Sequence, residues 1–213
     1  MTTAEGPATT ARRSRARRGE GDLLRDEILA ATDHLLLDAG DPEAVSIRAV
    51  ARAVGVTPPA IYLHFADKTD LIYQVCQDHW DRLTEDLRTA VTDIDDPLTW
   101  LDTAGRAYIA WGLAQPQAYR VMFMGRPQDV PDDVDKAEVI TAGIFGDLLA
   151  VVVRAVETGT MSGDPVMLAF QAWICVHGLV SLLVSTPEMP WPDHDRLITA
   201  TIETVLRAGG GTP

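Results

Sequence analysis

The sequence of 213 residues has only two cysteines, Cys76 and Cys175, which lie 99 positions apart. Two cysteines at that spacing form neither a disulfide framework nor a cysteine-based metal site, and unpaired thiols are typical of the reducing cytoplasm. Arginines occur near the N-terminus, but no apolar stretch follows them, so a secretory signal is not expected. The sequence thus indicates a cytoplasmic protein and excludes a disulfide-stabilised secreted scaffold.

Signals for β-strands are nearly absent as well, because no alternating apolar and polar run is bounded by hairpin turns. Apolar residues instead recur at spacings of three and four, and Ser, Thr, Asp, Pro and Gly stand at the ends of these runs. With a hydrophobic fraction of 46% to fill a core, the pattern predicts an all-α fold of about nine helices. The predicted helices cover residues 22–39, 47–54, 58–65, 67–91, 97–115, 116–124, 135–157, 165–186 and 196–208.

The common catalytic motifs are missing too. There is no glycine-rich phosphate loop, no H-E-x-x-H and no G-x-S-x-G. The five histidines lack metal-ligand spacing, and the many carboxylates look like solvated helix faces. We therefore expect neither an enzyme nor a resident metal or other cofactor.

Positive charge is scarce, with 18 Lys and Arg against 31 Asp and Glu, which gives a net charge of −13. Such an average argues against nucleic acid as a partner, but the positive charge is local, because residues 12–18 hold five arginines and no acid. Residues 1–82 have 10 basic and 13 acidic side chains, whereas residues 83–213 have 8 and 18. Only the N-terminal part is suited to approach DNA. Residues 1–21 are predicted to be a flexible basic arm that contacts DNA or is simply solvated.

One segment, residues 165–187, contains no Asp, Glu, Lys or Arg and is long enough to span a membrane. It nevertheless includes polar residues such as Gln171 and His177, and its flanks, Asp164 and Glu188, are acidic rather than basic. A helix buried in a core or at a subunit interface explains the segment better, so no membrane is expected as a partner.

The most informative segment is residues 46–65, which read SIRAVARAVGVTPPAIYLHF. Ser46 and Gly55 bound one short helix, and Pro58 takes the first position of a second. Ala51 stays small where the second helix crosses the first, and Gly55 can adopt the positive φ of a tight turn. The pattern predicts a helix-turn-helix, whose second helix enters the major groove of DNA. A purely structural helical hairpin is the alternative.

The preceding helix, the SIRAVARAVGV run, the YLHF that follows and Lys68 together resemble the DNA-binding head of the TetR family of bacterial transcription regulators. The resemblance covers residues 22–82 and implies a helical ligand-binding and dimerisation body over residues 83–213. It also implies a homodimer whose last two helices pair across a two-fold axis. The apolar residues available for that interface are Leu179, Leu182, Leu183, Leu197, Ile198, Ile202, Val205 and Leu206.

Carried over residue by residue, the resemblance implies a set of DNA contacts. In the family, Arg48 aligns with a position used on DNA, Tyr62 and His64 with contacts to the sugar–phosphate backbone, and Lys68 with a phosphate-binding lysine. Tyr62 could instead be a packed aromatic residue and His64 a cap. The recognition helix lacks the side chains that read adenine or guanine directly, so readout falls to Arg48, to thymine methyl contacts and to DNA shape. The full expected set is Ser46, Ile47, Arg48, Thr57, Pro58, Pro59, Ala60, Tyr62, Leu63, His64 and Lys68.

The body is rich in aromatic residues and methionine, which line adaptable apolar pockets but equally fill ordinary cores. The resemblance implies a small-molecule pocket among the body helices, and the segment WICVHGL resembles a C-terminal subtype marked by Trp173, His177 and Gly178. His177 is then either a satisfied core histidine or a polar group that orients a ligand. The expected ligand set is Trp100, Tyr108, Trp111, Met122, Phe123, Phe145, Trp173 and His177.

Taken together, the residues and the resemblance predict a homodimeric DNA-binding transcription regulator. We expect a repressor that a small apolar effector releases from a pseudo-palindromic double-stranded operator. The alternative is a ligand-binding or interaction protein whose helix-turn-helix head lacks operator-specific binding.

Overall fold

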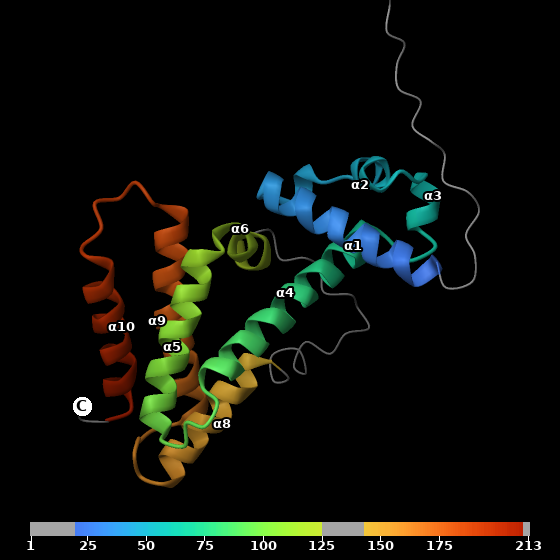
Figure 1. Cartoon of the computed structure of the whole chain (residues 1–213). Helices are drawn as coiled ribbons and strands as arrows, with labels where there is room; N and C mark the ends of the chain where they lie inside the picture. Colours follow the sequence, from blue (N-terminus) through green and yellow to red (C-terminus); the bar gives the residue numbers. More distant parts are fainter. Residues whose placement is uncertain (1–19, 125–142, 211–213) are drawn as a thin grey trace, which may run out of the picture. The chain divides into compact units, whose positions relative to one another are not determined.

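A computed structural model describes residues 20–124 and 143–210, and within these ranges the chain has nine α-helices and no strand (Figure 1). This confirms the predicted all-α fold. The α-helices are α1 (Glu20–Ala39), α2 (Ile47–Val54), α3 (Pro58–Ile61), α4 (Lys68–Ala90), α5 (Pro97–Ala114), α6 (Pro116–Tyr119), α8 (Ile144–Glu157), α9 (Pro165–Ser185) and α10 (His194–Ala208). A 3-10 turn, η1 (Pro42–Ala44), precedes α2, and a π-helical turn, η2 (Arg120–Met124), follows α6.

The chain divides into two compact units, Met1–Val75 and Cys76–Pro213, and the boundary falls inside α4. One continuous helix therefore belongs to both units. The expected division into an arm (residues 1–21), a head to residue 82 and a body stays a proposal. Residues 1–19 lie outside the described residues, whereas Glu20 and Gly21 belong to α1, which begins two residues before the predicted start.

In the first unit, the local signals of the helix-turn-helix act as the sequence predicts. The Ser46 hydroxyl accepts a hydrogen bond from the Ala49 amide at 3.2 Å and caps α2. Gly55 ends α2 with φ of 77°, a conformation that disfavours any residue with a Cβ. The buried apolar residues of this unit come from α1, α2, α3, the turn after α3 and the start of α4; they include Ile28, Leu36, Val50, Ala51, Ile61, Phe65, Leu71 and Ile72.

The recognition helix α3 is shorter than predicted, because it ends at Ile61 rather than near Phe65. The amides of His64 and Phe65 both donate to the Ile61 carbonyl, at 2.9 and 3.1 Å, so the chain continues as a hydrogen-bonded turn. Pro58 and Pro59 take the first two positions, whose amides have no acceptor within a helix, so they do not shorten α3; the tight turn at Ile61 ends it. Thr57 stands at the N-cap position but makes no capping hydrogen bond through its side chain.

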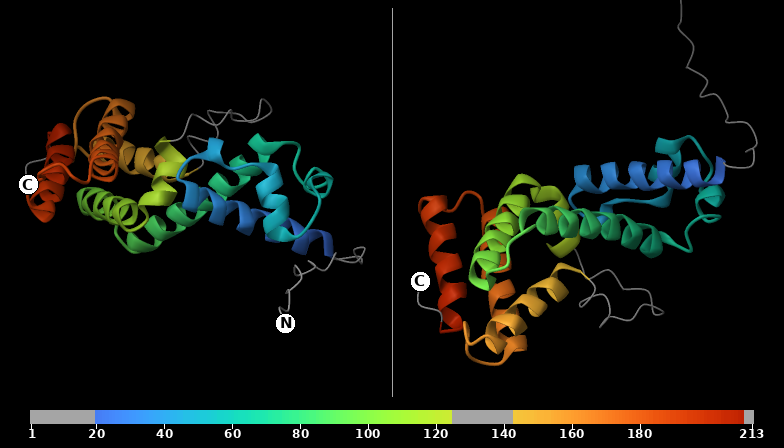
Figure 2. Two further views of the ribbon diagram at one scale, coloured as in Figure 1. Left: turned by 90° about the horizontal axis from the view of Figure 1, so that it is seen from above. Right: turned by 60° about the horizontal axis from the view of Figure 1, so that its bottom comes forward.

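In the second unit, α5 packs against α8, α9 and α10, and α9 also contacts α8 and α10 (Figure 2). Asp96, Asp164 and Asp193 cap α5, α9 and α10 through their carboxylates. The cap at Asp193 starts α10 at His194, two residues before the predicted start. The predicted helix over 135–157 is described only from Ile144, and its earlier part lies outside the described residues.

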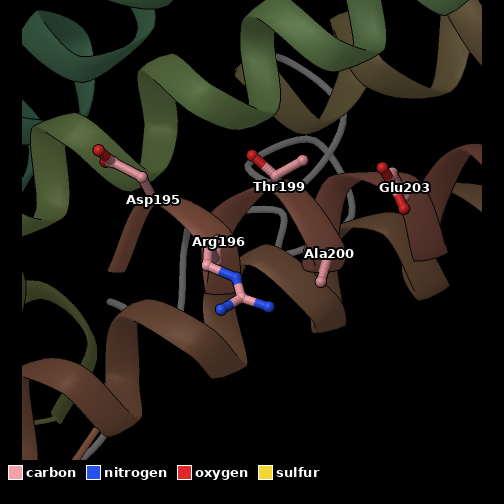
Figure 3. A pocket seen from close by; sticks show the side chains of 5 residues that line it. All are labelled: Asp195, Arg196, Thr199, Ala200 and Glu203. Atoms are coloured by element: carbon pink, nitrogen blue, oxygen red, sulfur yellow. The ribbon is translucent and has the colours of Figure 1, made fainter. Parts of the chain in front are cut away.

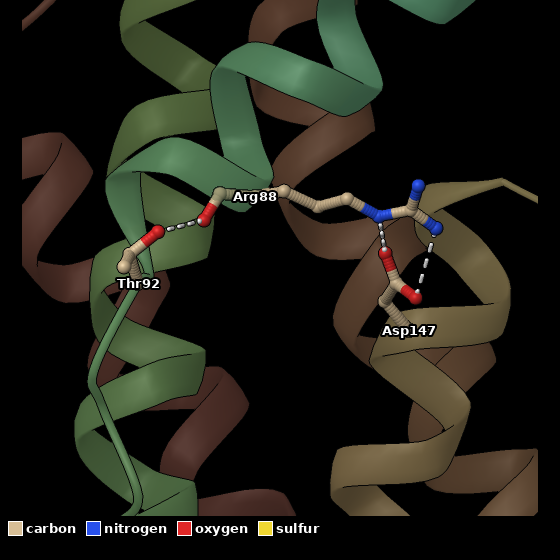
Figure 4. A network of polar contacts seen from close by, with 3 residues as sticks. All are labelled: Arg88, Thr92 and Asp147. Carbon is tan, nitrogen blue, oxygen red and sulfur yellow. Dashed lines mark hydrogen bonds and ion pairs between the residues drawn. The ribbon is translucent and has the colours of Figure 1, made fainter.

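The C-terminal end of α4 is joined to α8 within this unit by a bidentate ion pair (Figure 4). The Arg88 Nε and Nη2 atoms donate to the two carboxylate oxygens of Asp147 at 2.7 and 3.2 Å. The Thr92 hydroxyl donates to the Arg88 carbonyl at 3.0 Å, one turn further on. Parallel donation from a planar guanidinium fixes orientation as well as distance, so α4 and α8 are held in register there.

α9 is the uncharged helix of the sequence, and among the described residues it is the one helix long and apolar enough to cross a membrane. A core helix passes the same test, and α9 buries Leu168, Ala169, Ala172, Val176, Leu179, Val180, Leu183 and Val184 within the protein. Packing inside the body therefore explains much of its apolar character.

The interface residues expected on α9 and α10 differ in burial, and three of the eight, Leu197, Ile198 and Leu206, are half-buried. Leu179, Leu183, Ile202 and Val205 are buried within the protomer, at 1–8% exposure, because α9 and α10 use them to pack on each other and on α5. These four cannot form the outer surface that a partner would cover, whereas Leu182 is 51% exposed. The sequence missed Ile174, which is 63% exposed on the same helix.

A close contact between α5 and α9 makes a testable point about stability. A Cβ added at Gly112 would lie 2.4 Å from a methyl carbon of Val180 and 3.3 Å from the Tyr119 ring. Gly112→Ala is therefore expected to lower the free energy of unfolding by about 1–3 kcal/mol through overpacking. Gly21→Ala on α1, where nothing lies within 4 Å, is the control and should be neutral or stabilising. Urea titration of both variants measures this, and equal stabilities would contradict the close packing.

Candidate DNA-binding surface and ligand site

The exposed side of the helix-turn-helix presents polar and apolar side chains together. Arg48 projects from α2 as an exposed residue, and after α3 Tyr62 is 53% and Leu63 is 83% exposed. Because Tyr62 and Leu63 are both largely exposed, they contribute little to the core of this unit. They are available for contact with a base methyl and a phosphate respectively.

The other expected DNA residues are distributed around this turn. Ser46, Thr57 and Pro59 are exposed, and Ile47, Pro58, Ala60 and His64 are half-buried. The Ser46 oxygen is occupied as an acceptor by the cap of α2, so its proton is the part left for a phosphate. His64 lies beside Phe65 with the ring centroids 6.5 Å apart.

A network links α1, the turn after α3 and the first two turns of α4. Ala66 donates its amide to the Asp70 carboxylate at 2.8 Å, and the Gln74 side chain donates to the same carboxylate at 2.7 Å. Arg25 donates to Gln74, and its guanidinium lies 5.5 Å from the centre of the Phe65 ring. These contacts fix the segment between the recognition helix and α4, and sequence reasoning missed them because the partners are up to 49 positions apart.

Lys68, the expected phosphate ligand, begins α4 and is a third exposed. Its ammonium lies 3.9 Å from the carboxylate of Glu43 in η1, which is an acidic neighbour that the sequence did not predict. When a phosphate approaches Lys68, this carboxylate repels it and competes for the same cation.

Glu43→Gln is therefore expected to raise affinity for duplex DNA of any sequence by about 2–5-fold, the range of one exposed ion pair. The gain should shrink in the Lys68→Ala background, because the competing cation is then gone. Asp26→Asn removes one charge from an exposed site on α1 and controls for net charge. Fluorescence anisotropy with a duplex at several salt concentrations compares the wild type with Glu43→Gln, Lys68→Ala, the double variant and Asp26→Asn. Equal gains from Glu43→Gln and Asp26→Asn would contradict a specific role for the pair.

In the body, aromatic rings from four segments form one connected cluster. The Trp80 ring of α4 lies 4.9 Å from Phe123 in η2, and Phe123 lies 4.7 Å from His177 of α9. The chain of rings continues from His177 to Trp173 at 5.4 Å and from Trp173 to Phe145 of α8 at 5.8 Å. Phe170 completes it, with its ring 4.8 Å from Phe145.

Two tyrosines give this aromatic cluster a polar centre. The hydroxyl oxygens of Tyr108 (α5) and Tyr119 (α6) each lie 2.9 Å from Nδ1 of His177, and the Tyr119 hydroxyl donates to the His177 carbonyl at 3.0 Å. Burial raises the pKa of Tyr108, raises the pKa of Tyr119 to about 12, and lowers the pKa of His177. All three groups are therefore uncharged at neutral pH.

Five of the eight expected ligand residues belong to this cluster: Tyr108, Phe123, Phe145, Trp173 and His177. Trp100 packs elsewhere, in the core with Val91 and Leu101, while Trp111 is buried on α5 and Met122 is half-buried in η2. Sequence reasoning missed Tyr119, Trp80 and Phe170. The aromatic content of the body could have indicated Tyr119 and Phe170 as candidates. Nothing in the sequence indicated that Tyr119 contacts His177.

A separate open hollow lies along α10, lined by Asp195, Arg196, Thr199, Ala200 and Glu203 (Figure 3). Its side chains come from one face of a single helix and carry both signs of charge. Arg106 of α5 donates to Thr199 at 3.5 Å beside it. The residues that line it include no member of the expected ligand set, so the hollow is distinct from the aromatic cluster.

An all-helical chain with a helix-turn-helix unit, joined through one long helix to a larger helical unit, defines a class of DNA-binding regulators. Comparison with known families agrees. The family model described as "Bacterial regulatory proteins, tetR family" matches residues 28–75, and the one described as "Tetracyclin repressor-like, C-terminal domain" matches residues 101–205. The two matches lie in the first and second units and together span most of the chain, which belongs to the TetR family of regulators.

Individual relatives support the assignment. The HTH-type transcriptional activator FasR of Mycolicibacterium smegmatis is 27% identical over 193 residues, covering 89% of this chain and 83% of FasR. Two solved structures share the fold. A protein of unknown function from Rhodococcus sp. RHA1 has a TM-score of 0.72 and 24% identity, over 87% of this chain and 94% of that one. The fatty acid degradation regulator FadR from Bacillus halodurans has a TM-score of 0.68 and 17% identity, over 90% and 97%.

The protein is therefore a DNA-binding transcription regulator. Regulators of this family bind DNA and small-molecule ligands and act as dimers. The family is one of regulators rather than enzymes. FasR is an activator, so family membership alone does not make a member a repressor.

Proposed function

We propose that this protein is a cytoplasmic homodimeric repressor that leaves a pseudo-palindromic operator when a small apolar molecule binds its body. The observation that carries the proposal is the pairing of an exposed helix-turn-helix surface with a separate aromatic cluster that contains a polar centre. The helix-turn-helix surface offers hydrogen-bond donors to DNA. The aromatic cluster combines apolar side chains with a few convergent polar groups, as small-molecule sites do.

On the DNA side, Arg48 contacts bases or the backbone from α2, while Tyr62, His64 and Lys68 bind phosphates around the recognition turn. The exposure of Arg48, Tyr62 and Leu63 supports this assignment. The basic arm, residues 1–21, adds phosphate or minor-groove contacts on the strength of its five arginines.

On the ligand side, the site is the aromatic cluster around His177, within the body at residues 83–213, with Trp80 contributed by α4. The Trp-His-Gly subtype fits this arrangement in part. Trp173 and His177 belong to the cluster, whereas a Cβ at Gly178 would meet nothing within 4 Å. An open glycine on α9 suits a close approach by a second copy of the helix.

The proposal is tested by titrating the dimer with genomic fragments and then adding candidate apolar effectors. Linkage requires that an effector which weakens operator binding also binds more weakly to the protein–operator complex, by the same factor. A reporter gene behind the bound promoter shows whether the protein activates or represses transcription. Loss of expression when the regulator is added supports a repressor. Equal effector affinity for free and operator-bound protein would leave a regulator without a ligand response.

A further inference from the structure

The polar centre of the aromatic cluster has a defined order of hydrogen bonds. The Tyr119 hydroxyl lies 3.0 Å from the backbone carbonyl of His177, which can only accept, so the single Tyr119 proton goes there. The same oxygen lies 2.9 Å from Nδ1 of His177. Because Tyr119 has no second proton to donate, that contact is attractive only when Nδ1 carries the hydrogen.

The contacts of Tyr108 also require that Nδ1 carries the hydrogen. Its hydroxyl also lies 2.9 Å from Nδ1, and it is hydrogen-bonded to Tyr119. If Tyr108 donated to a bare Nδ1, the lone pairs of Nδ1 and Tyr119 would face each other at 2.9 Å. Tyr108 instead donates to the Tyr119 oxygen, and Nδ1–H donates to the tyrosine oxygens. The indole N–H of Trp173 is a further donor to the Tyr108 oxygen, whose lone pairs can accept from both Trp173 and Nδ1, so each proton in the centre has an acceptor.

The order of hydrogen bonds at Nδ1 also determines the state of Nε2, the other ring nitrogen of His177. In a neutral imidazole only one nitrogen carries hydrogen, so a protonated Nδ1 makes Nε2 a bare acceptor. The hydrogen bonds of the His177 ring in the described residues all involve Nδ1. In an imidazole ring the Nε2 lone pair points away from Nδ1, and therefore away from the partners of Nδ1. The His177 ring is half-buried, with its centroid 4.7 Å from that of Phe123 and 5.4 Å from that of Trp173.

We propose that Tyr119 locks His177 in the Nδ1–H tautomer, so that Nε2 selects an uncharged apolar ligand which carries a hydroxyl or N–H donor. The inference rests on the proposed ligand site and specifies the chemistry of its ligand. A carboxylate or an ether oxygen would place a lone pair against Nε2. A ligand with one donor on an aromatic or aliphatic skeleton satisfies Nε2 and packs on the rings of Phe123 and Trp173.

The low pKa of His177 agrees with this geometry. Burial disfavours the imidazolium, so the ring stays neutral and keeps its Nε2 lone pair at neutral pH. A protonated ring would have donors on both nitrogens and would favour anionic ligands instead.

The tautomer is tested without any ligand, on the full-length dimer labelled with ¹⁵N-histidine. Long-range proton–nitrogen correlation spectra distinguish the two tautomers, and His177→Gln assigns the His177 signals. We expect Nδ1–H in the wild type and in Tyr108→Phe, because Tyr119 still accepts from Nδ1. In Tyr119→Phe, Tyr108 loses its acceptor and donates to Nδ1, so the hydrogen moves to Nε2. A wild-type ring with hydrogen on Nε2 would overturn the proposal.

Ligand selection is tested by calorimetry with 2-naphthol and 2-methoxynaphthalene, which share a ring system but differ in the donor. The wild type should bind 2-naphthol at least about tenfold more tightly than 2-methoxynaphthalene, because an unpaired acceptor is costly. Tyr119→Phe should lose or reverse this preference. Equal affinities in the wild type, or no binding of 2-naphthol up to its solubility limit, would overturn the proposal.

The two proposals fail in different ways. If the tautomer and the hydroxyl preference are found but 2-naphthol leaves operator binding unchanged, the ligand chemistry stands and the repressor-release function is contradicted for that ligand. If operator binding responds to apolar effectors but 2-methoxynaphthalene binds as well as 2-naphthol, the proposed function stands and the role of Nε2 is contradicted.

Discussion

Replacement of Ile174 and Leu182 by glutamate is expected to convert the protein from a dimer to a monomer. Both side chains are more than half exposed on α9. They are eight residues apart, which places them about 80° apart around the helix and within the width of one contact face. Charges on that face would oppose burial against a second copy, and neither substitution disturbs a buried core position. Sedimentation velocity measures the change, and Leu23→Glu, an exposed leucine of α1, serves as the control that stays dimeric.

The same variant should bind its operator about 100-fold more weakly or worse. Dimerisation presents the second head at a high effective concentration once the first has bound its half-site, and a monomer loses that gain. Gly178→Trp is an independent variant, because a Cβ at that position meets nothing within 4 Å in the protomer and the bulky side chain would hold two helices apart. A dimer in both variants would show that the exposed face of α9 is not the interface.

Arg48→Ala and Lys68→Ala are expected to weaken DNA binding in different ways. Arg48 is exposed on α2 of the helix-turn-helix and is proposed to read bases, so its loss should cost about 1–3 kcal/mol on the best operator and reduce sequence preference. Lys68 is the proposed phosphate ligand, so its loss should weaken all sequences alike and lower the slope of log affinity against log salt by about one.

Anisotropy titrations with an operator and a scrambled duplex, at four or more salt concentrations, separate the two effects. Arg88→Ala provides a control that removes a cation paired with Asp147 in the body. If Arg48→Ala weakened operator and scrambled duplex equally, its role in sequence reading would be contradicted. An unchanged salt slope in Lys68→Ala would contradict its role at a phosphate.

The sequence alone determined the helical elements and the motif that places this protein in its family. Helix boundaries follow from local chemistry, in which Ser46 caps α2, Gly55 ends it and aspartates open the body helices. These signals act within three or four residues, so they can be read without the fold. The helix-turn-helix and its exposed residues follow from the same local spacing.

Only the tertiary structure decided which of the apolar residues on α9 and α10 are core. Leu182 and Leu183 are neighbours in sequence, yet one is 51% exposed and the other 6%, because the direction in which α9 meets α5 and α10 selects the buried face. A helix that is apolar all round carries no periodicity from which that face could be predicted.

Tertiary structure also decided the partners of the functional side chains. Glu43 meets Lys68 across 25 positions, and Tyr108 and Tyr119 meet His177 across 69 and 58. Composition indicated that the body is aromatic, but a hydrogen bond requires donor and acceptor within about 3 Å. Distances of that kind are set by the packing of α5, α6 and α9 on one another. For that reason the sequence could name His177 as a candidate while leaving its two tyrosine partners, and the nitrogen left for a ligand, to the fold.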